Sequence, residues 1–228
     1  MPPWLVAVES ALGVRPVICL VTDRRRLPGG SETALVEHLS AAARAGVHLI
    51  QIRERDLDAR ALARMAAAAV EAARGTSTRI LVNDRTDVAL AAGAHGVHLR
   101  GDSAAAMRIR EIVPRGFLIG RSVHSREEAE RAAEEGGLDY LMFGTVFETV
   151  SKPGVPAAGT ASLAAIARAV PLPVLAIGGI TISRMAEVAE AGAAGFAGIG
   201  LFGDSPPDGL QVVVGEASLA FDTLSRVP

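Results

Sequence analysis

The chain reads Pro173-Val174-Leu175-Ala176-Ile177-Gly178-Gly179 near its C-terminal end, a short apolar run that stops at two glycines. An amphipathic segment from Ile182 to Ala191 follows, and then a second apolar run from Phe196 to Gly200. Short apolar runs bounded by turn residues are typical of buried parallel strands, and the segment between them is typical of a crossover helix. The stretch therefore predicts a strand–helix–strand unit.

The same unit recurs along the rest of the chain. Further apolar runs predict strands over Val17–Thr22, Val47–Ile52, Arg79–Asn83, Gly96–Leu99, Phe117–Arg121 and Tyr140–Phe143. Helical patterns predict helices over Ser31–Gly46, Leu57–Ala73, Asp87–Ala92, Ala104–Val113, Arg126–Glu135, Ser162–Ala169 and Gly209–Leu224. Eight strands that alternate with helices favour a closed (β/α)8 barrel, an α/β fold. An open doubly wound sheet is the alternative, but the first strand-to-helix turn lacks its dinucleotide-type glycine pattern.

The length of 228 residues suits one barrel domain over 1–228. Within it we expect an N-terminal extension (1–15), the barrel (16–203) and a final helical segment (204–228). The longest irregular stretch runs from Glu148 to Gly159, and an irregular stretch of this length in a compact domain is often functional.

Composition narrows the class of protein. The net charge of −2 argues against a nucleic-acid partner, although Arg24-Arg25-Arg26 is locally basic and lies either in a solvated loop or at the mouth of a site. The one cysteine, Cys19, excludes a disulfide within the chain and is expected to be a buried small hydrophobe. The start of the chain, Met1 to Gly13, does not resemble a signal peptide, and we find no apolar segment of membrane-spanning length. We therefore expect a cytoplasmic protein with no membrane partner.

Glycines at the ends of the last two predicted strands indicate an anion site. In a barrel of this class the active site lies where the strands end, and phosphate is usually held after strands seven and eight. Glycines let backbone N–H groups approach an anion, and a following helix adds its positive dipole. We predict phosphate binding by Gly178, Gly179, Ile199 and Gly200, with tight turns as the structural alternative.

Polar residues follow strands two and three. Period-two alternation places Gln51, Arg53 and Arg55 on one face, toward the barrel mouth, where they would meet an anionic or polar substrate. Asn83 and Asp84 follow the third strand and either orient a ligand, hold a cation or, for Asp84, cap the next helix.

Strand five runs into Gly120-Arg121-Ser122-Val123-His124-Ser125. His124 is expected at the mouth, where a histidine can act as general acid and base. Ser125 and Glu128 form a capping-box pattern for the following helix, so part of the motif is structural. His98 is expected to be a buried, hydrogen-bonded residue of the barrel. The histidines show no metal-binding spacing.

Several of these segments, in this order, resemble the thiamine phosphate synthase and TenI superfamily, which has a barrel fold. The resemblance spans Leu20 to Gly200. It rests on Leu20-Val21-Thr22-Asp23, the Gln-x-Arg-x-basic pattern of Gln51–Arg55, Val82–Arg85, Gly96–Leu99, the strand-six motif and the Gly178-Gly179 turn.

The resemblance separates two branches. The synthase joins a pyrimidine diphosphate to a thiazole phosphate using magnesium, and its Gly-Val-His-x-Gly-Gln-Glu-Asp pattern ends in a metal-binding aspartate. Here Ser103 holds that position, and Val150 stands where the synthase's Thr-Lys-Thr-Lys loop has its first lysine. The segments Gly120–Ser125 and Phe143–Thr149 instead look like motifs of TenI thiazole tautomerases.

The resemblance therefore implies a tautomerase that aromatises a carboxylated thiazole phosphate in thiamine biosynthesis. It implies His124 as the acid/base, no cofactor and no metal. The implied substrate-binding residues are Gln51, Arg53, Arg55, Asn83, Ser122, Thr149 and Lys152. Arg53 is our expectation for the carboxylate. A small-molecule thiazole phosphate would be the ligand, and barrels of this family often form homodimers. The synthase and a non-catalytic thiazole-phosphate-binding regulator are the alternatives.

Overall fold

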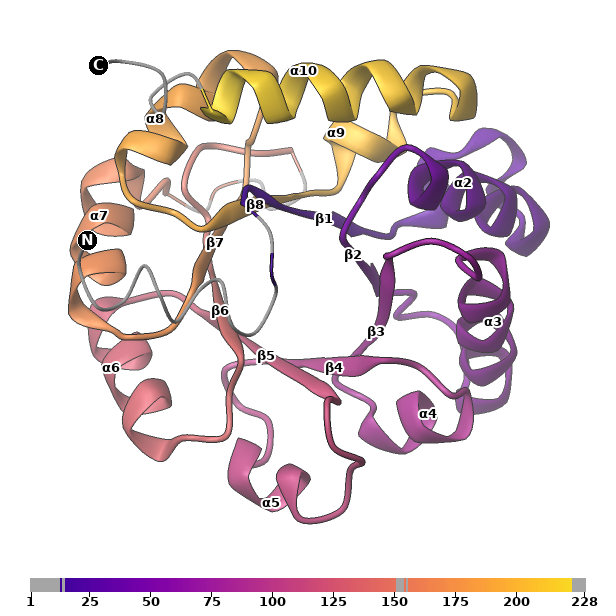
Figure 1. The fold of residues 1–228 in the computed structure, drawn as a ribbon, viewed down its shortest axis with the longest axis horizontal. Coiled ribbons are helices and arrows are strands. Elements are labelled where there is room, and N and C mark those ends of the chain that lie inside the picture. The colour runs from indigo at the N-terminus through magenta and orange to yellow at the C-terminus, as the bar shows by residue number, and fades with distance from the viewer. Residues whose placement is uncertain (1–12, 14, 151–153, 155, 223–228) are drawn as a thin grey trace.

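The computed structural model describes residues 13, 15–150, 154 and 156–222. These residues form a closed barrel, in which parallel strands pair in chain order and the last strand returns to the first. Figure 1 looks down this barrel, with the strands inside a ring of helices. The expected (β/α)8 barrel is confirmed, and the open sheet is excluded.

The elements alternate along the chain as expected. The strands are β1 (Val17–Val21), β2 (Leu49–Ile52), β3 (Arg79–Asn83), β4 (Gly96–Leu99), β5 (Leu118–Val123), β6 (Tyr140–Phe143), β7 (Val174–Ile177) and β8 (Gly195–Gly198). The α-helices are α2 (Glu32–Arg44), α3 (Ala59–Ala72), α4 (Thr86–Ala91), α5 (Ala106–Arg110), α6 (Arg126–Glu135), α7 (Gly159–Ala169), α8 (Met185–Glu190), α9 (Gly200–Gly203) and α10 (Leu210–Asp222). Short 3₁₀ turns occupy Arg24–Arg26, Pro28–Gly30, Ile182–Arg184 and Pro207–Gly209.

Three boundaries differ from the sequence-based expectation in ways that matter. Strand β5 runs on to Val123, so His124 follows it directly. Strand β8 stops at Gly198, because the chain turns there into the one-turn helix α9. Helix α5 ends at Arg110. The guanidinium of Arg110 donates to the carbonyl of Phe117 and to the carboxylate of Asp139.

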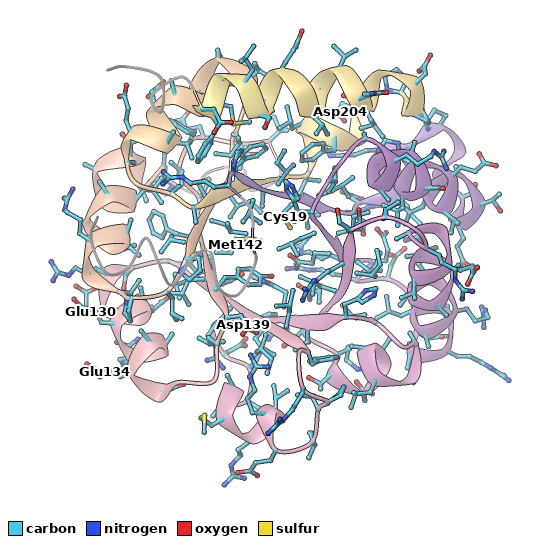
Figure 2. The ribbon with its side chains drawn as sticks, viewed as in Figure 1. Cys19, Glu130, Glu134, Asp139, Met142 and Asp204 are labelled. Atoms are coloured by element: carbon cyan, nitrogen blue, oxygen red, sulfur yellow. The ribbon has the colours of Figure 1, made fainter. Side chains whose placement is uncertain are left out.

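Alternate residues of each strand pack into two separate layers. One cluster, inside the barrel, contains Cys19, Leu81 and Met142, and Figure 2 labels the first and last of these within the ring of strands. The other cluster lies between the strands and the helices. Cys19 is buried as expected, and this burial raises the pKa of its thiol to about 12.

Helix α10 forms although it contains three consecutive valines, Val212 to Val214. Its residues Leu210, Val214, Ala217 and Phe221 are buried against the barrel. Tertiary packing of one apolar face outweighs the modest helix penalty of β-branched residues. Among the residues that the structure describes, no helix is long and apolar enough to cross a membrane.

Candidate active site

A large cavity opens at the C-terminal ends of the strands. Its volume is about 1230 Å³, and every strand from β1 to β8 contributes a lining residue at or near its end. The lining includes the predicted residues Gln51, Arg53, Arg55, Asn83, Ser122, His124, Thr149, Gly178, Gly179, Ile199 and Gly200. The remaining predicted site residue, Lys152, lies outside the described residues.

Strand β2 and the residues directly after it present polar side chains to the cavity, as period-two alternation predicts. Gln51 is buried, Arg53 is half-buried and Arg55 is exposed. Gln51 Nε2 donates to Asn83 Oδ1 at 2.9 Å, which joins β2 to β3. Burial lowers the pKa of the Arg53 guanidinium, and the positive charge of Arg55 lowers it further. In the described part of the chain, the Arg53 guanidinium forms no hydrogen bond or ion pair, so it is available to an anionic ligand.

Asp84 does not cap the following helix, so that part of its prediction is wrong. Helix α4 has Arg85 at its N-cap and lacks a side-chain cap. Asp84 instead adopts a left-handed backbone conformation, and its carboxylate accepts a hydrogen bond from the Ser103 hydroxyl. The guanidinium of Arg100 lies 3.5 Å from the same carboxylate.

These neighbours bear on whether Asp84 can hold the magnesium ion that the synthase branch implies. Magnesium keeps several of its waters and is usually bound by one or two carboxylates together with substrate phosphates. Over the described ranges, no three acidic, histidine or cysteine side chains are grouped as a metal site. Arg100 also places a positive charge beside Asp84 and Asp102, where it would repel a cation. Asp84 is therefore a single carboxylate with a guanidinium beside it, which is an unfavourable position for a magnesium ion.

His124 is positioned by the start of helix α6. Ser125 caps the helix, since its hydroxyl accepts from the Glu128 backbone N–H at 3.2 Å. The Glu128 carboxylate in turn accepts from the backbone N–H of His124 at 2.7 Å, one residue earlier than in a standard capping box. The expected helix cap is confirmed, and it fixes the backbone that carries the histidine.

The imidazole of His124 has a defined tautomer in its neutral form. Its Nδ1 lies 2.5 Å from the backbone carbonyl oxygen of Gly144. A carbonyl can only accept, so Nδ1 carries the proton and Nε2 carries the lone pair. Since His124 lines the cavity, Nε2 is a base at the barrel mouth.

The glycine turn after β7 has a backbone conformation that other residues rarely adopt. Gly178 and Gly179 have φ of 101° and 63°. A Cβ on Gly179 would overlap the Glu148 carbonyl oxygen, because the loop after β6 packs directly on this turn. Ile199 and Gly200 were expected in the last strand but instead form the N-terminal end of α9. Residues of both turns thus line one part of the cavity, which we call the glycine pole (Gly178, Gly179, Ile199 and Gly200).

The sequence did not predict an ion pair beside the glycine pole, between Arg26 and Asp204. Arg26 Nη1 lies 2.6 and 2.8 Å from the two carboxylate oxygens of Asp204, and both residues line the cavity beside Gly200. Figure 2 labels Asp204, which directly follows helix α9. A separation of 178 residues leaves no pattern in the sequence that pairs them. The expectation of a solvated Arg24–Arg26 loop is wrong for Arg24 and Arg26, because Arg24 also pairs with Glu54 and Asp56.

We predict that Asp204→Asn strengthens phosphate binding. The substitution removes a negative charge from the glycine pole and frees the Arg26 guanidinium for an anion. Because the pair is partly exposed, the expected gain is about two- to fivefold in the dissociation constant of a thiazole phosphate, measured by calorimetry. Asp208→Asn removes the same charge outside the cavity and should change nothing. Equal effects of the two substitutions would contradict the prediction.

Comparison with known proteins identifies the family. Residues 18–202 match the TMP-TENI family model, which is described as thiamine monophosphate synthase. The chain belongs to the TMP-TENI family. The superfamily resemblance seen in the sequence is thereby confirmed.

Relatives of this TMP-TENI chain carry one recurrent name. This chain is 41% identical to the thiamine-phosphate synthase of Roseiflexus castenholzii over 175 residues. The match covers 76% of this chain and 75% of that protein. The chain is 44% identical over 170 residues to the thiamine-phosphate synthase of Methanoculleus marisnigri, covering 74% and 79% of the two chains. Thiamine phosphate pyrophosphorylase from Pyrococcus furiosus has a similar structure, with a TM-score of 0.77 and 31% identity over 91% of this chain and 96% of that one.

The names of these relatives bear on the choice between the tautomerase and the synthase. They support an enzyme of thiamine biosynthesis, and they favour the synthase, our alternative, over the tautomerase. They give the isomerase assignment no specific support. The choice between the two reactions in this TMP-TENI protein therefore depends on its own residues.

Proposed function

We propose that this TMP-TENI protein binds a thiazole phosphate and aromatises its carboxylated tautomer by general acid/base catalysis. The observation that carries the proposal is His124, which lines the cavity with Nδ1 bonded to the Gly144 carbonyl and Nε2 left as a base. The glycine pole would hold the phosphate, and Arg53 would meet the carboxylate. The residue roles implied by the resemblance remain part of this proposal.

The reaction balances without a redox partner. His124 Nε2 takes a proton from a ring carbon, and the electron pair shifts into the ring as the double bond moves inward from the exocyclic position. The protonated histidine then returns a proton to the exocyclic carbon. The Gly144 carbonyl accepts from Nδ1–H throughout, so it holds the ring in place and stabilises the imidazolium. Substrate and product are isomers, and the histidine ends as it began.

A direct assay tests the proposal. The isolated tautomer is mixed with the protein, and the appearance of the aromatic ring is followed by absorbance. Acceleration over the protein-free rate is expected. An unchanged rate with tight binding of the tautomer would indicate the non-catalytic regulator instead.

Magnesium removal provides a second prediction. Because Arg100 and Ser103 occupy the surroundings of Asp84, we expect a chelator to leave the rate of tautomer consumption unchanged. A loss of about tenfold or more on chelation, restored by magnesium, would show that the reaction needs a cation and would contradict this account of the site.

The synthase is the second candidate, and two observations favour it. The relatives named above are called synthases, and a volume of about 1230 Å³ exceeds the roughly 300–1,000 Å³ typical of single-ligand pockets. Formation of thiamine phosphate from hydroxymethylpyrimidine diphosphate and thiazole phosphate would establish it. The homodimer and the cytoplasmic location stay predictions under either function.

A further inference from the structure

A buried hydrogen-bond chain ends at the cavity floor. The Tyr140 hydroxyl lies 2.9 Å from His98 Nδ1, and His98 Nε2 lies 2.8 Å from the hydroxyl of Ser122. Tyr140 and His98 are 0% and 1% exposed, whereas Ser122 is half-buried and lines the cavity. The chain therefore connects a residue deep inside the barrel to a group that a ligand can touch.

Glycine at position 120 makes the hydrogen bond between Tyr140 and His98 possible. His98, Gly120 and Tyr140 are paired neighbours across β4, β5 and β6. A Cβ on Gly120 would overlap the Tyr140 ring, so the ring fills the space that glycine leaves. Tyr140 can thus reach across β5 to His98.

His98 is neutral, so it has one donor and one acceptor nitrogen. Burial lowers its pKa to about 3, and the nearby positive charge of Arg53 contributes to this shift. One of its two neighbours must therefore donate to the ring and the other must accept from it. Two arrangements satisfy this condition, and they give Ser122 opposite roles.

The surroundings of Tyr140 decide between the two arrangements. If Nδ1–H donated to Tyr140, the buried phenol proton would lack an acceptor in the described structure, where His98 is its one hydrogen-bond partner. If Tyr140 donates to Nδ1, Nε2–H donates to Ser122, and the phenol and both imidazole nitrogens are satisfied. The Ser122 hydroxyl proton is then free to point into the cavity.

We propose that Tyr140 and His98 are positioning residues that make Ser122 a hydrogen-bond donor for the substrate's carboxylate. The inference rests on the proposed function, because it names the part of the cavity that recognises the carboxyl group of the thiazole. Two further donors line the same floor. Arg53 has no bonded partner for its guanidinium among the described residues, and Asn83 uses its Oδ1 for Gln51, which leaves its NH₂ group for a ligand. A carboxylate can accept from several donors at once, and these three side chains line the same cavity.

The tautomer of His98 is measurable in the ligand-free protein. Nitrogen-15 NMR of the labelled imidazoles distinguishes a proton on Nε2 from one on Nδ1, and loss of a signal in His98→Asn assigns it. We expect the Nε2–H form at neutral pH in the wild type. The Nδ1–H form, or a charged ring, would overturn the proposal. The tautomer itself is read from the wild-type protein, and the variant serves only to assign the signal.

Binding tests the role of Ser122. Dissociation constants are measured by calorimetry for carboxythiazole phosphate and for the same thiazole phosphate without the carboxyl group. Ser122→Ala should weaken binding of the carboxylated ligand by roughly ten- to a hundredfold and leave binding of the other ligand unchanged. Ser40→Ala, on helix α2 outside the cavity, should change neither. Equal weakening of both ligands by Ser122→Ala would contradict the assignment.

Tyr140→Phe tests the positioning chain itself. It keeps the ring and removes the donor to Nδ1, so the His98 proton is no longer confined to Nε2. We expect a change in the nitrogen-15 signals of His98 and a loss of affinity for the carboxylated ligand alone. Unchanged signals and affinity would overturn the positioning role. Carboxylate-selective binding without turnover would refute the proposed function and leave this inference standing. Turnover without carboxylate selectivity would refute this inference and leave the proposed function standing.

Discussion

His124→Asn is expected to slow tautomer consumption by about 10²- to 10⁴-fold, which is the usual contribution of a positioned acid/base group. Asparagine retains a polar group that can donate to the Gly144 carbonyl, but it cannot take and return a proton. Affinity for the thiazole phosphate should stay within about twofold, since the glycine pole is untouched. The measurement is the absorbance assay at saturating tautomer.

His95→Asn provides the matched control for this substitution. His95 lies just before β4, at the opposite end of the barrel from the cavity, and its Nδ1 accepts from the backbone N–H of Ile80. Asparagine offers a replacement acceptor there. We expect wild-type turnover from this control. Wild-type turnover from His124→Asn would instead remove the histidine from the proposed reaction.

Gly179→Ala is expected to abolish tight phosphate binding and to lower the free energy of unfolding. A methyl group at φ +63° is strained, and it would also overlap the Glu148 carbonyl oxygen and lie 2.8 Å from Phe147 Cβ. The turn or the loop after β6 must move, so the backbone N–H groups lose their alignment. Overpacking of this kind costs about 1–3 kcal/mol in addition to the backbone strain. Calorimetric titration with thiazole phosphate and thermal unfolding measure the two effects.

Gly93→Ala separates the packing effect from the backbone strain. Gly93 has φ +66°, close to that of Gly179, but no neighbouring atom lies within 4 Å of the point that a Cβ would occupy. It should therefore show the strain alone and retain phosphate binding. If both substitutions destabilised equally and neither affected binding, the glycine pole would not be the phosphate site.

Much of the site could be predicted because strand alternation fixes which residues face inward. Gln51 on β2 and Arg53 just after it follow this rule, and Ser122 follows it on β5. The glycine turns could be predicted for a similar reason, since paired glycines at strand ends indicate tight turns. Alternation and strand ends are local properties, and local patterns are what a single sequence carries.

The parts that could not be predicted depend on contacts between distant residues. Arg26 and Asp204 meet because β1 and β8 are neighbours in the closed barrel. Asp84 accepts from Ser103 rather than capping α4, because the turn after β4 brings the serine hydroxyl to its carboxylate. The hydrogen bonds from Tyr140 through His98 to Ser122 require three adjacent strands in register. Such pairings follow from the fold and not from any one segment.

The central claim is that this cavity performs proton transfer on one thiazole phosphate. One preparation of the protein should be assayed for tautomer consumption with a chelator, and for thiamine phosphate formation from both synthase substrates with magnesium. We predict tautomer consumption at least about a hundredfold faster than any formation of thiamine phosphate. Magnesium-dependent thiamine phosphate formation, with no acceleration of tautomer consumption, would contradict this claim.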